Sequence, residues 1–348
     1  MSINLLPIAD FDAPKLLGSF DYSQVENIEY LQAQRGSDLQ IVGDRLYVRV
    51  KADQSATELH WYAFDIADKS APQALGQFSV NLTSSDYPTT TYIDGDYLYL
   101  HSEALTIVDI SNIDDPKTLF SANLASMADD AFDESRWWPA SAIYQDTLYL
   151  ASYTKLLVID ISDKAAPDVV DYVASFPDEN MQFEITTLQV YKNYLFVTNA
   201  GGYNSSEVLI YDIAAPEVPK LLSQVEATGF YSSVSISDGW LYLTTSEARP
   251  SDSIHDVYYP SYVRAYDIAD ISAPKFIHRY ESVGKAGTLL SNKRGVLTSN
   301  GGAFSHPSSI KASAPRLGEL TDIGTIQDIV IDKDIAYVAT SEKRTCNT

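Results

Sequence analysis

Apolar and polar residues alternate in short runs along this chain, and the runs are separated by Gly, Asp and Asn turns. Segments such as VGDRLYVRV from Val42 and SDGWLYLTT from Ser237 place Leu-Tyr-Val or Leu-Tyr-Leu directly after a turn pair. An alternation of period two is typical of a β-strand. Turn residues that accept positive φ join two strands in a tight hairpin. Since an alternating segment also precedes each turn, each unit has a predicted first and second strand.

A second pattern follows each hairpin. A nearly continuous apolar run, such as LLVID at residues 156–160, predicts a third strand that is buried on both faces. The run leads into Asp-Ile-Ala/Ser, four further residues and Pro, and we expect this Asp to accept a backbone N–H and stabilise a turn. The Pro ends the strand ladder before a fourth strand. Five copies begin at Asp65, Asp109, Asp160, Asp212 and Asp267, and weaker ones cover residues 7–14 and 308–315.

The spacing of these copies predicts the fold. Their last prolines stand at positions 14, 72, 116, 167, 219, 274 and 315, and a period on the order of 50 residues with four strands is the size of a propeller blade. The chain starts with a third and fourth strand at about 3–20 and ends with a first and second strand at about 325–341. We therefore predict an all-β, seven-bladed β-propeller of four-stranded antiparallel blades. It would be a single domain, 1–348, whose ring is closed by a composite blade from both termini.

The third strand and its turn resemble a known family. LTIVDISNIDDP from Leu105 and LLVIDISDKAAP from Leu156 are similar to the LVIVD repeat, which occurs in bacterial and archaeal proteins that are mostly exported or surface-attached. The resemblance covers nearly the whole chain and is weakest at residues 289–320. It implies a propeller and a secreted, periplasmic or cell-surface location, and it carries no catalytic or ligand residues. The first residues, MSINLLPIADF, lack the basic and apolar segments of a signal peptide, so we expect the leader to be absent from this chain.

Charge and cysteine content limit the classes of partner and the disulfides that this chain can have. Asp and Glu number 47 against 24 Lys and Arg, which gives a formal net charge of −23 with the acids dispersed along the chain. This favours an acidic, well-solvated surface and disfavours nucleic acid, whose phosphates need clustered Lys and Arg. A single cysteine, Cys346, excludes an intrachain disulfide. No apolar run approaches the length of a transmembrane segment.

Known catalytic signatures are absent from the sequence: a Gly-x-Ser-x-Gly elbow, His-Glu-x-x-His, a phosphate-binding Gly loop, paired CxxC and an EF-hand loop. His60, His101 and His278 lie in or beside predicted strands, and we interpret them as packed or surface residues. His255 and His306 fall in the predicted connections between second and third strands, at residues 245–262 and 299–310.

These connections and those from a fourth to the next first strand, at residues 82–92, 124–141 and 175–186, are long, whereas the turns at the other end of each blade are short. Long loops without regular structure of their own often carry function. Aromatic side chains with a few polar groups suit sugars, peptides or protein partners. An alternative is that Trp137 and Trp138 pack into the core, and His255, Asp256 and His306 are also metal-ligand types. The candidate ligand- or partner-binding residues are Arg136, Trp137, Trp138, His255, Asp256, Tyr258, Tyr259 and His306.

Two functions remain. The first is a non-catalytic binding or interaction module without a cofactor, whose partner is a protein or a glycan. The alternative is a propeller enzyme, a hydrolase or lyase on a polysaccharide or lactone, with a polar site or a divalent cation at the central mouth. The positions that enter each first strand bear on this choice, and few of them are acids. Aligned on the second-strand leucines, they are Asp38, Thr90, Ala140, Thr187 and Ser233, with Glu184, Tyr231, Lys285 and Asp328 nearby in sequence. The binding module is therefore the preferred prediction.

Overall fold

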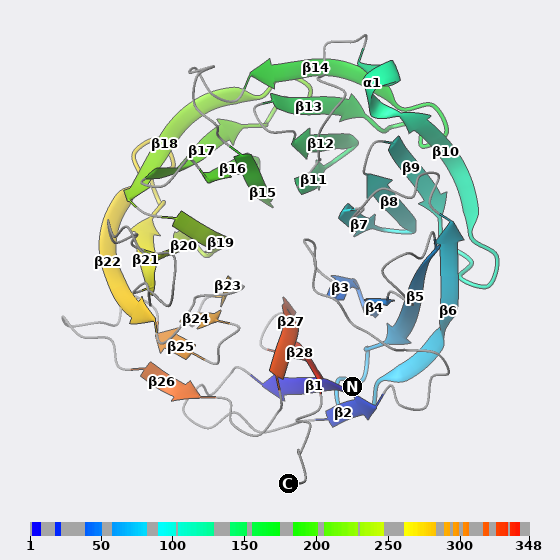
Figure 1. Ribbon diagram of the computed structural model, residues 1–348, viewed down its shortest axis with the longest axis horizontal. Helices are drawn as coiled ribbons and strands as arrows, with labels where there is room; N and C mark the ends of the chain where they lie inside the picture. Colours follow the sequence, from blue (N-terminus) through cyan, green and yellow to red (C-terminus); the bar gives the residue numbers. More distant parts are fainter. Residues whose placement is uncertain are drawn as a thin grey trace, which may run out of the picture. The chain divides into compact units, whose positions relative to one another are not determined.

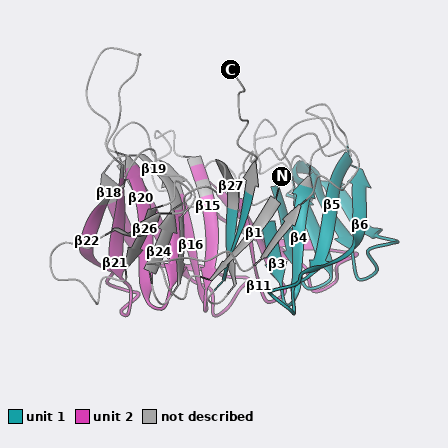
Figure 2. Ribbon diagram, turned by 90° about the horizontal axis from the view of Figure 1, so that it is seen from below, with its two compact units in different colours: residues 1–134, 320–348 teal, residues 135–319 magenta. Residues whose placement is uncertain are grey.

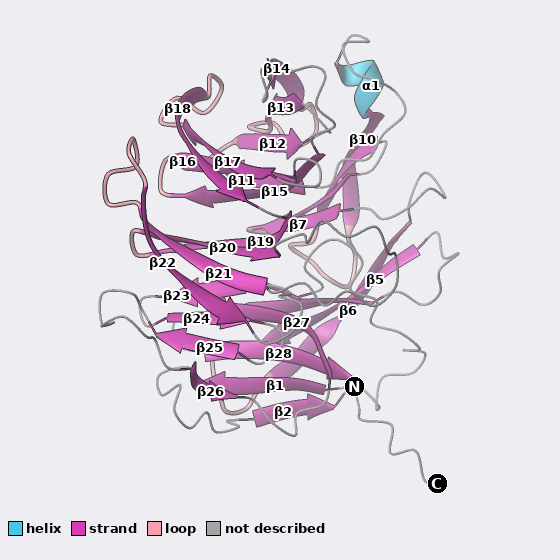
Figure 3. Ribbon diagram, turned by 60° about the vertical axis from the view of Figure 1, so that its left-hand side comes forward, coloured by secondary structure: helices cyan, strands magenta, loops and turns pink. Residues whose placement is uncertain are grey.

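The structure is a computed structural model whose chain divides into two compact units (Figure 2). Unit 1 comprises residues 1–134 and 320–348, and unit 2 comprises residues 135–319. Almost all described residues outside the turns belong to β-strands (Figure 3). The described residues are 2–7, 18–21, 39–50, 58–81, 90–101, 104–128, 140–151, 155–174, 184–200, 205–228, 230–246, 261–282, 289–292, 295–298, 302–305, 316–319, 325–332 and 335–341.

Three four-stranded antiparallel sheets form the described part of unit 1 (Figure 1). A composite sheet takes strands from both ends of the chain in the order β2-β1-β28-β27, with β1 Ser2–Pro7, β2 Gly18–Asp21, β27 Thr325–Asp332 and β28 Ile335–Ser341. The next sheet has β3 Leu39–Val42, β4 Arg45–Val50, β5 Glu58–Asp65 and β6 Gln73–Asn81. The third has β7 Thr90–Asp94, β8 Tyr97–His101, β9 Ala104–Asp109 and β10 Lys117–Asn123.

Four further four-stranded antiparallel sheets form the described part of unit 2. The first is β11 Ala140–Tyr144, β12 Thr147–Ala151, β13 Lys155–Asp160 and β14 Asp168–Ala174. The second is β15 Glu184–Tyr191, β16 Tyr194–Ala200, β17 Ser205–Asp212 and β18 Lys220–Thr228. The third is β19 Phe230–Ser237, β20 Trp240–Ser246, β21 Ser261–Asp267 and β22 Lys275–Ser282. The fourth is β23 Leu289–Asn292, β24 Gly295–Thr298, β25 Gly302–Ser305 and β26 Arg316–Glu319.

The predicted all-β fold, the four-stranded antiparallel sheets and the pairing of the two chain ends are confirmed. Ile3 of β1 lies opposite Ala339 of β28, and the pairing continues to Pro7 and Ile335. The connection predicted at residues 299–310 is wrong in its bounds, because β25 occupies part of it. Its GGAF stretch has too little alternation to mark a strand. The closed seven-bladed ring and the single domain stay predictions.

A helix of four residues, α1 at Leu124–Met127, begins the stretch 124–141 that we predicted to be a loop. The Asn123 side chain accepts hydrogen bonds from the backbone N–H groups of Ala125 and Ser126, which is the usual capping arrangement. Leu124, the first residue of this helix, is buried. Within the described ranges, no helix is long and apolar enough to span a membrane.

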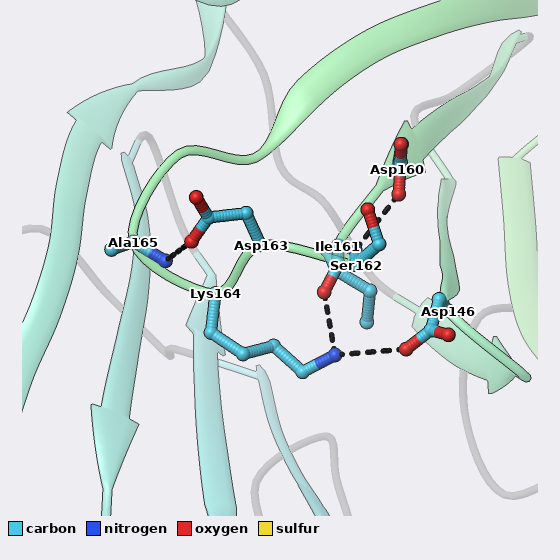
Figure 4. A network of polar contacts seen from close by, with 7 residues as sticks. All are labelled: Asp146, Asp160, Ile161, Ser162, Asp163, Lys164 and Ala165. Atoms are coloured by element: carbon cyan, nitrogen blue, oxygen red, sulfur yellow. Dashed lines mark hydrogen bonds and ion pairs between the residues drawn. The ribbon is translucent and has the colours of Figure 1, made fainter.

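The first Asp of the repeated turn accepts a backbone hydrogen bond in each copy, and Figure 4 shows the copy at Asp160. In the sheet of β11–β14, Asp160 Oδ1 accepts from Ser162 N at 2.8 Å and Asp163 Oδ1 accepts from Ala165 N at 2.9 Å. The buried Ile161 donates its N–H to Asp146 O in the preceding hairpin turn at 2.8 Å, so the two turns are tied together. The first Asp makes the equivalent bond at 2.8 to 2.9 Å in all five copies, at Asp65, Asp109, Asp160, Asp212 and Asp267. The predicted capping role of the Asp is therefore confirmed.

Replacing Asp160 by Ala should lower the free energy of unfolding by about 1 kcal/mol, the typical net contribution of one hydrogen bond. The Ser162 backbone N–H holds the pKa of Asp160 below its ordinary value. This contribution is therefore present above the ordinary Asp pKa and is lost as the pH falls through the folded-state pKa. Chemical denaturation at pH 7 and pH 3 would measure it, with Asp160→Asn, which keeps an acceptor oxygen, as the control. Loss of partner binding by Asp160→Ala with unchanged stability would instead give the turn a functional role.

Neighbouring sheets are joined by an aromatic residue and the next Asp turn. The third residue of each second strand is a fully buried aromatic side chain in six sheets: Tyr47, Tyr99, Tyr149, Phe196, Tyr242 and Tyr337. In unit 2, Tyr149 Oη donates to Pro216 O at 2.7 Å, and Pro216 is the fifth residue of the following Asp turn. In unit 1, the fifth turn residue Lys69 places its Nζ 5.8 Å from the centre of the Tyr337 ring. In these two places the aromatic residue and the next Asp turn form a joint between neighbouring sheets.

The outer strands carry a repeated β-bulge. In six sheets the register between the third and fourth strands shifts by one residue, and the extra residue is apolar. A bulge interrupts pairing and twists the strand, which protects an exposed sheet edge against joining another chain. The residues skipped by the register are Leu75, Leu119, Val170, Leu222, Ile277 and Leu317.

Candidate functional site

The end of each sheet opposite the Asp turns has a row of residues in register. The fifth residue of the second strand is buried in six sheets, and it lies opposite a first-strand residue near the start of that strand. Four of the positions aligned from the sequence are the first-strand residues of this row. Asp328, which we predicted only to lie nearby in sequence, is the first-strand residue in a fifth sheet. Asp38 and Lys285 lie outside the described residues. The pairs are Thr90 with His101, Ala140 with Ala151, Thr187 with Thr198, Ser233 with Thr244, and Asp328 with Ala339.

This row differs from sheet to sheet, unlike the Asp turns. The second-strand member is Ala in two sheets and Thr in two others, whereas β4 has Arg49 and β8 has His101. Ala and Thr have small side chains without an ionisable group, so they fit a buried position. A guanidinium and an imidazole at the same depth need polar surroundings or cost stability. The two exceptions both belong to unit 1.

Arg49 is part of a polar contact between two sheets of unit 1. Its side chain is 6% exposed, and Nη1 donates to Thr91 Oγ1 on β7 at 3.3 Å. Gln40 of β3 reaches the same strand, because Nε2 donates to Thr91 O at 3.1 Å and Oε1 accepts from Ile93 N at 2.7 Å. The Gln40 side chain therefore bonds the backbone of β7 where a further strand would otherwise do so. Arg49 places a positive charge at Thr91 of the same strand.

His101 ends strand β8 and is fully buried. In the part of the chain that the structure describes, neither ring nitrogen has a hydrogen-bond partner. Burial lowers the pKa of His101 from its ordinary value of 6.5 to about 3, so the imidazole is neutral at pH 7.

Hydroxyl groups occupy the equivalent row in two sheets of unit 2, as Thr198 and Thr244, whereas Ala151 occupies it in a third. Thr198 Oγ1 donates to Thr187 O at 3.0 Å, which satisfies the buried hydroxyl within its own hairpin. In the next sheet the hydroxyl of Thr245, one residue beyond the row, accepts a hydrogen bond from Arg264 Nε at 3.0 Å. These contacts are internal to a sheet and brace the strand ends.

Most of the predicted binding residues lie outside the described residues: Arg136, Trp137, Trp138, His255, Asp256, Tyr258 and Tyr259. His306 lies outside them as well, and its predicted position in the chain is corrected. Because β25 ends at Ser305, His306 belongs to the connection between a third and a fourth strand, not between a second and a third. Within the described ranges, no group of three or more His, Cys, Asp or Glu residues could hold a metal ion.

The sequence patterns did not single out Arg49 and His101 as a pair, and His101 was predicted to be a packed or surface histidine. A signal for them exists in the sequence. Both stand three residues after the aligned second-strand leucine, where the other strong copies have Ala151, Thr198 and Thr244. An ionisable residue at a position that is otherwise small is the feature that could have identified them.

Comparison with known proteins agrees with this architecture. Residues 79–290 match the family model described as a Beta propeller domain. The chain belongs to the beta-propeller domain family. None of the curated proteins matches it.

Three solved structures of the same fold overlap nearly the whole chain. A functionally unknown protein from Desulfotomaculum acetoxidans is 13% identical with a TM-score of 0.56, over 94% of this chain and 93% of that one. The periplasmic gluconolactonase PpgL of Pseudomonas aeruginosa is 12% identical with a TM-score of 0.55, over 98% and 100%. Apo AztD from Citrobacter koseri is 12% identical with a TM-score of 0.54, over 98% and 99%. At these identities the likeness shows the fold alone.

Proposed function

We propose that this propeller is a non-catalytic binding module of a cell-surface, periplasmic or secreted assembly. In this proposal residues 1–348 form one seven-bladed domain of the LVIVD-repeat type, closed by the composite sheet. Its partner is a protein or a glycan, and it does not bind nucleic acid.

The contrast between the two ends of the sheets carries the proposal. At one end, the carboxylates of the repeated Asp residues are engaged by backbone N–H groups in every copy, so they serve the fold. At the other end, the residue of the buried row is Ala in two sheets, Thr in two others, and Arg49 and His101 in the remaining two of the six. Residues 136–138 and 255–259 fall in connections between strand ends of this second kind. Variation on a constant framework is what a binding surface requires.

A triple variant, Trp137→Ala, Trp138→Ala and Tyr258→Ala, tests the location of the site. We expect at least a tenfold loss of affinity for the partner, since aromatic residues dominate the energetics of such surfaces. Glycan arrays and pull-down from a cell-surface fraction would measure it. The control is Leu221→Ala, an exposed residue at the Asp-turn end of β18. Full affinity in the triple variant would place the site elsewhere, and loss of folding would show that the tryptophans belong to the core.

The second candidate is a lactone or polysaccharide enzyme with a divalent cation at the central mouth. It is favoured by the full-length overlap with the gluconolactonase PpgL, which is an analogy of fold. Hydrolysis of gluconolactone by the chelated protein, with and without added Ca²⁺, Mg²⁺ or Zn²⁺, would distinguish the candidates. Metal-dependent turnover would support the enzyme.

A further inference from the structure

A buried histidine is placed where protonation has a local structural cost. His101 closes the hairpin of β7 and β8, and its backbone lies directly opposite Thr90 and Leu105 on the two flanking strands. Its side chain has no exposed surface, and neither nitrogen has a partner among the described residues. A neutral imidazole tolerates such surroundings far better than an imidazolium, which needs two acceptors or water.

Among the described residues of its own sheet, the neighbours of His101 on its face offer the cation no compensation. On the same face of the sheet, β7 contributes Thr90 and Tyr92, β9 contributes Leu105, and β8 itself contributes Tyr99. None of these is negatively charged at neutral pH, and burial raises the pKa of Tyr92. Asp94, the acid of β7 on this face, stands four residues from Thr90, which is roughly 13 Å along a strand.

The opposite face of the same strand end already carries a positive charge. Arg49 of β4 donates to Thr91, the residue next to Thr90, and it is nearly buried there. The first two residues of β7 are thus flanked by a guanidinium on one face and by His101 on the other. Protonation of His101 would add a second buried cation at the same end of β7, which a low-dielectric interior makes costly.

We propose that the Thr90–His101 end of the sheet β7–β10 is an acid-sensitive latch, closed while the imidazole is neutral and opened when it takes up a proton. The inference stands on the contacts of unit 1 and does not depend on the proposed function. In the closed state the pKa of His101 is about 3, and in an opened hairpin it returns towards 6.5. Between these values only the open state binds the proton. The open population therefore grows about tenfold for each pH unit below 6.5.

Hydrogen exchange followed by mass spectrometry tests the latch in the full chain. After correction for the intrinsic exchange rate, protection of peptides from β7, β8 and β9 should fall about fiftyfold between pH 6.5 and pH 4.5, since the open-state imidazole is already half protonated at pH 6.5. The matched variant is His101→Thr, because Thr198 and Thr244 occupy the equivalent buried position in unit 2. It should remove most of this pH dependence. His60→Thr, a partly exposed histidine of β5, should leave it unchanged.

Three results would overturn the proposal. One is an equal loss of protection in His101→Thr. Another is the same slope in peptides from β11 to β18, which would indicate global unfolding. The third needs no variant: NMR of the wild-type imidazole that showed titration near 6.5 in the folded protein would mean that protonation leaves the hairpin closed.

Discussion

Deleting residues 1–20 is expected to abolish cooperative folding. The deletion removes β1 and nearly all of β2, which together form half of the composite sheet, and leaves β28 without the strand that pairs along it from Thr340 to Ile335. The loss of two strands from the sheet that contributes Tyr337 and Ala339 to the core would exceed about 5 kcal/mol, which is the whole stability of many domains. Thermal unfolding followed by circular dichroism, with size-exclusion chromatography for aggregation, would measure the effect.

The control for this deletion is a chain that lacks residues 342–348, which lie beyond β28. It should melt like the full-length protein. A chain without residues 1–20 that also melted like the full-length protein would show that the composite sheet is dispensable, and the closed ring that we propose would then lose its main support.

Replacing Tyr149 by Ala should cost about 3 to 5 kcal/mol of unfolding free energy, the usual range for removing a large buried aromatic side chain. The ring is fully buried in the core shared by the first two sheets of unit 2, and its hydroxyl donates to Pro216 O in the next Asp turn. Burial raises the pKa of the Tyr149 hydroxyl, so this donor keeps its proton throughout the neutral range.

Tyr149→Phe is the matched variant, because the chain itself has Phe196 at the equivalent position of the following sheet. It should cost only about 1 kcal/mol, the contribution of the hydrogen bond alone. Urea denaturation of the three proteins would separate the two contributions. If Tyr149→Phe proved as damaging as Tyr149→Ala, the joint would depend on the hydroxyl and not on the packing of the ring.

Much of the fold could be predicted from the sequence because the repeat has local causes. Turn pairs mark each hairpin, and left-handed residues do occupy those turns, at Gly43, Gly95, Gln145, Lys192 and Asp238. The Asp after each third strand has one geometric role, so its recurrence marks the same place in each unit. The local signal weakens at β25, which is a Gly-rich stretch without alternation. The sequence therefore predicted a connection there and not a strand, which was wrong.

The candidate site was harder to predict for a physical reason. Arg136 and Tyr258 are in long connections, where no periodicity relates a residue to a position in space. Arg49 and His101 stand in strands with an ordinary pattern, and their significance appears only from the register, which places both at a depth where other sheets have Ala or Thr. Residue type alone does not distinguish a buried ionisable group from an exposed one on the same strand.

The pairing of β1 with β28 also bears on the time course of folding. Ile3 and Ala339 come from opposite ends of the printed sequence, so their contact closes the longest loop among the strand pairs. Such a contact has the highest entropic cost and forms late, whereas each hairpin can form from neighbouring residues. During synthesis, β1 leaves the ribosome long before its partner exists. The apolar strand β1 therefore stays unpaired until the C-terminal hairpin has been made. The slowest step of folding would be the pairing of β28 with β1.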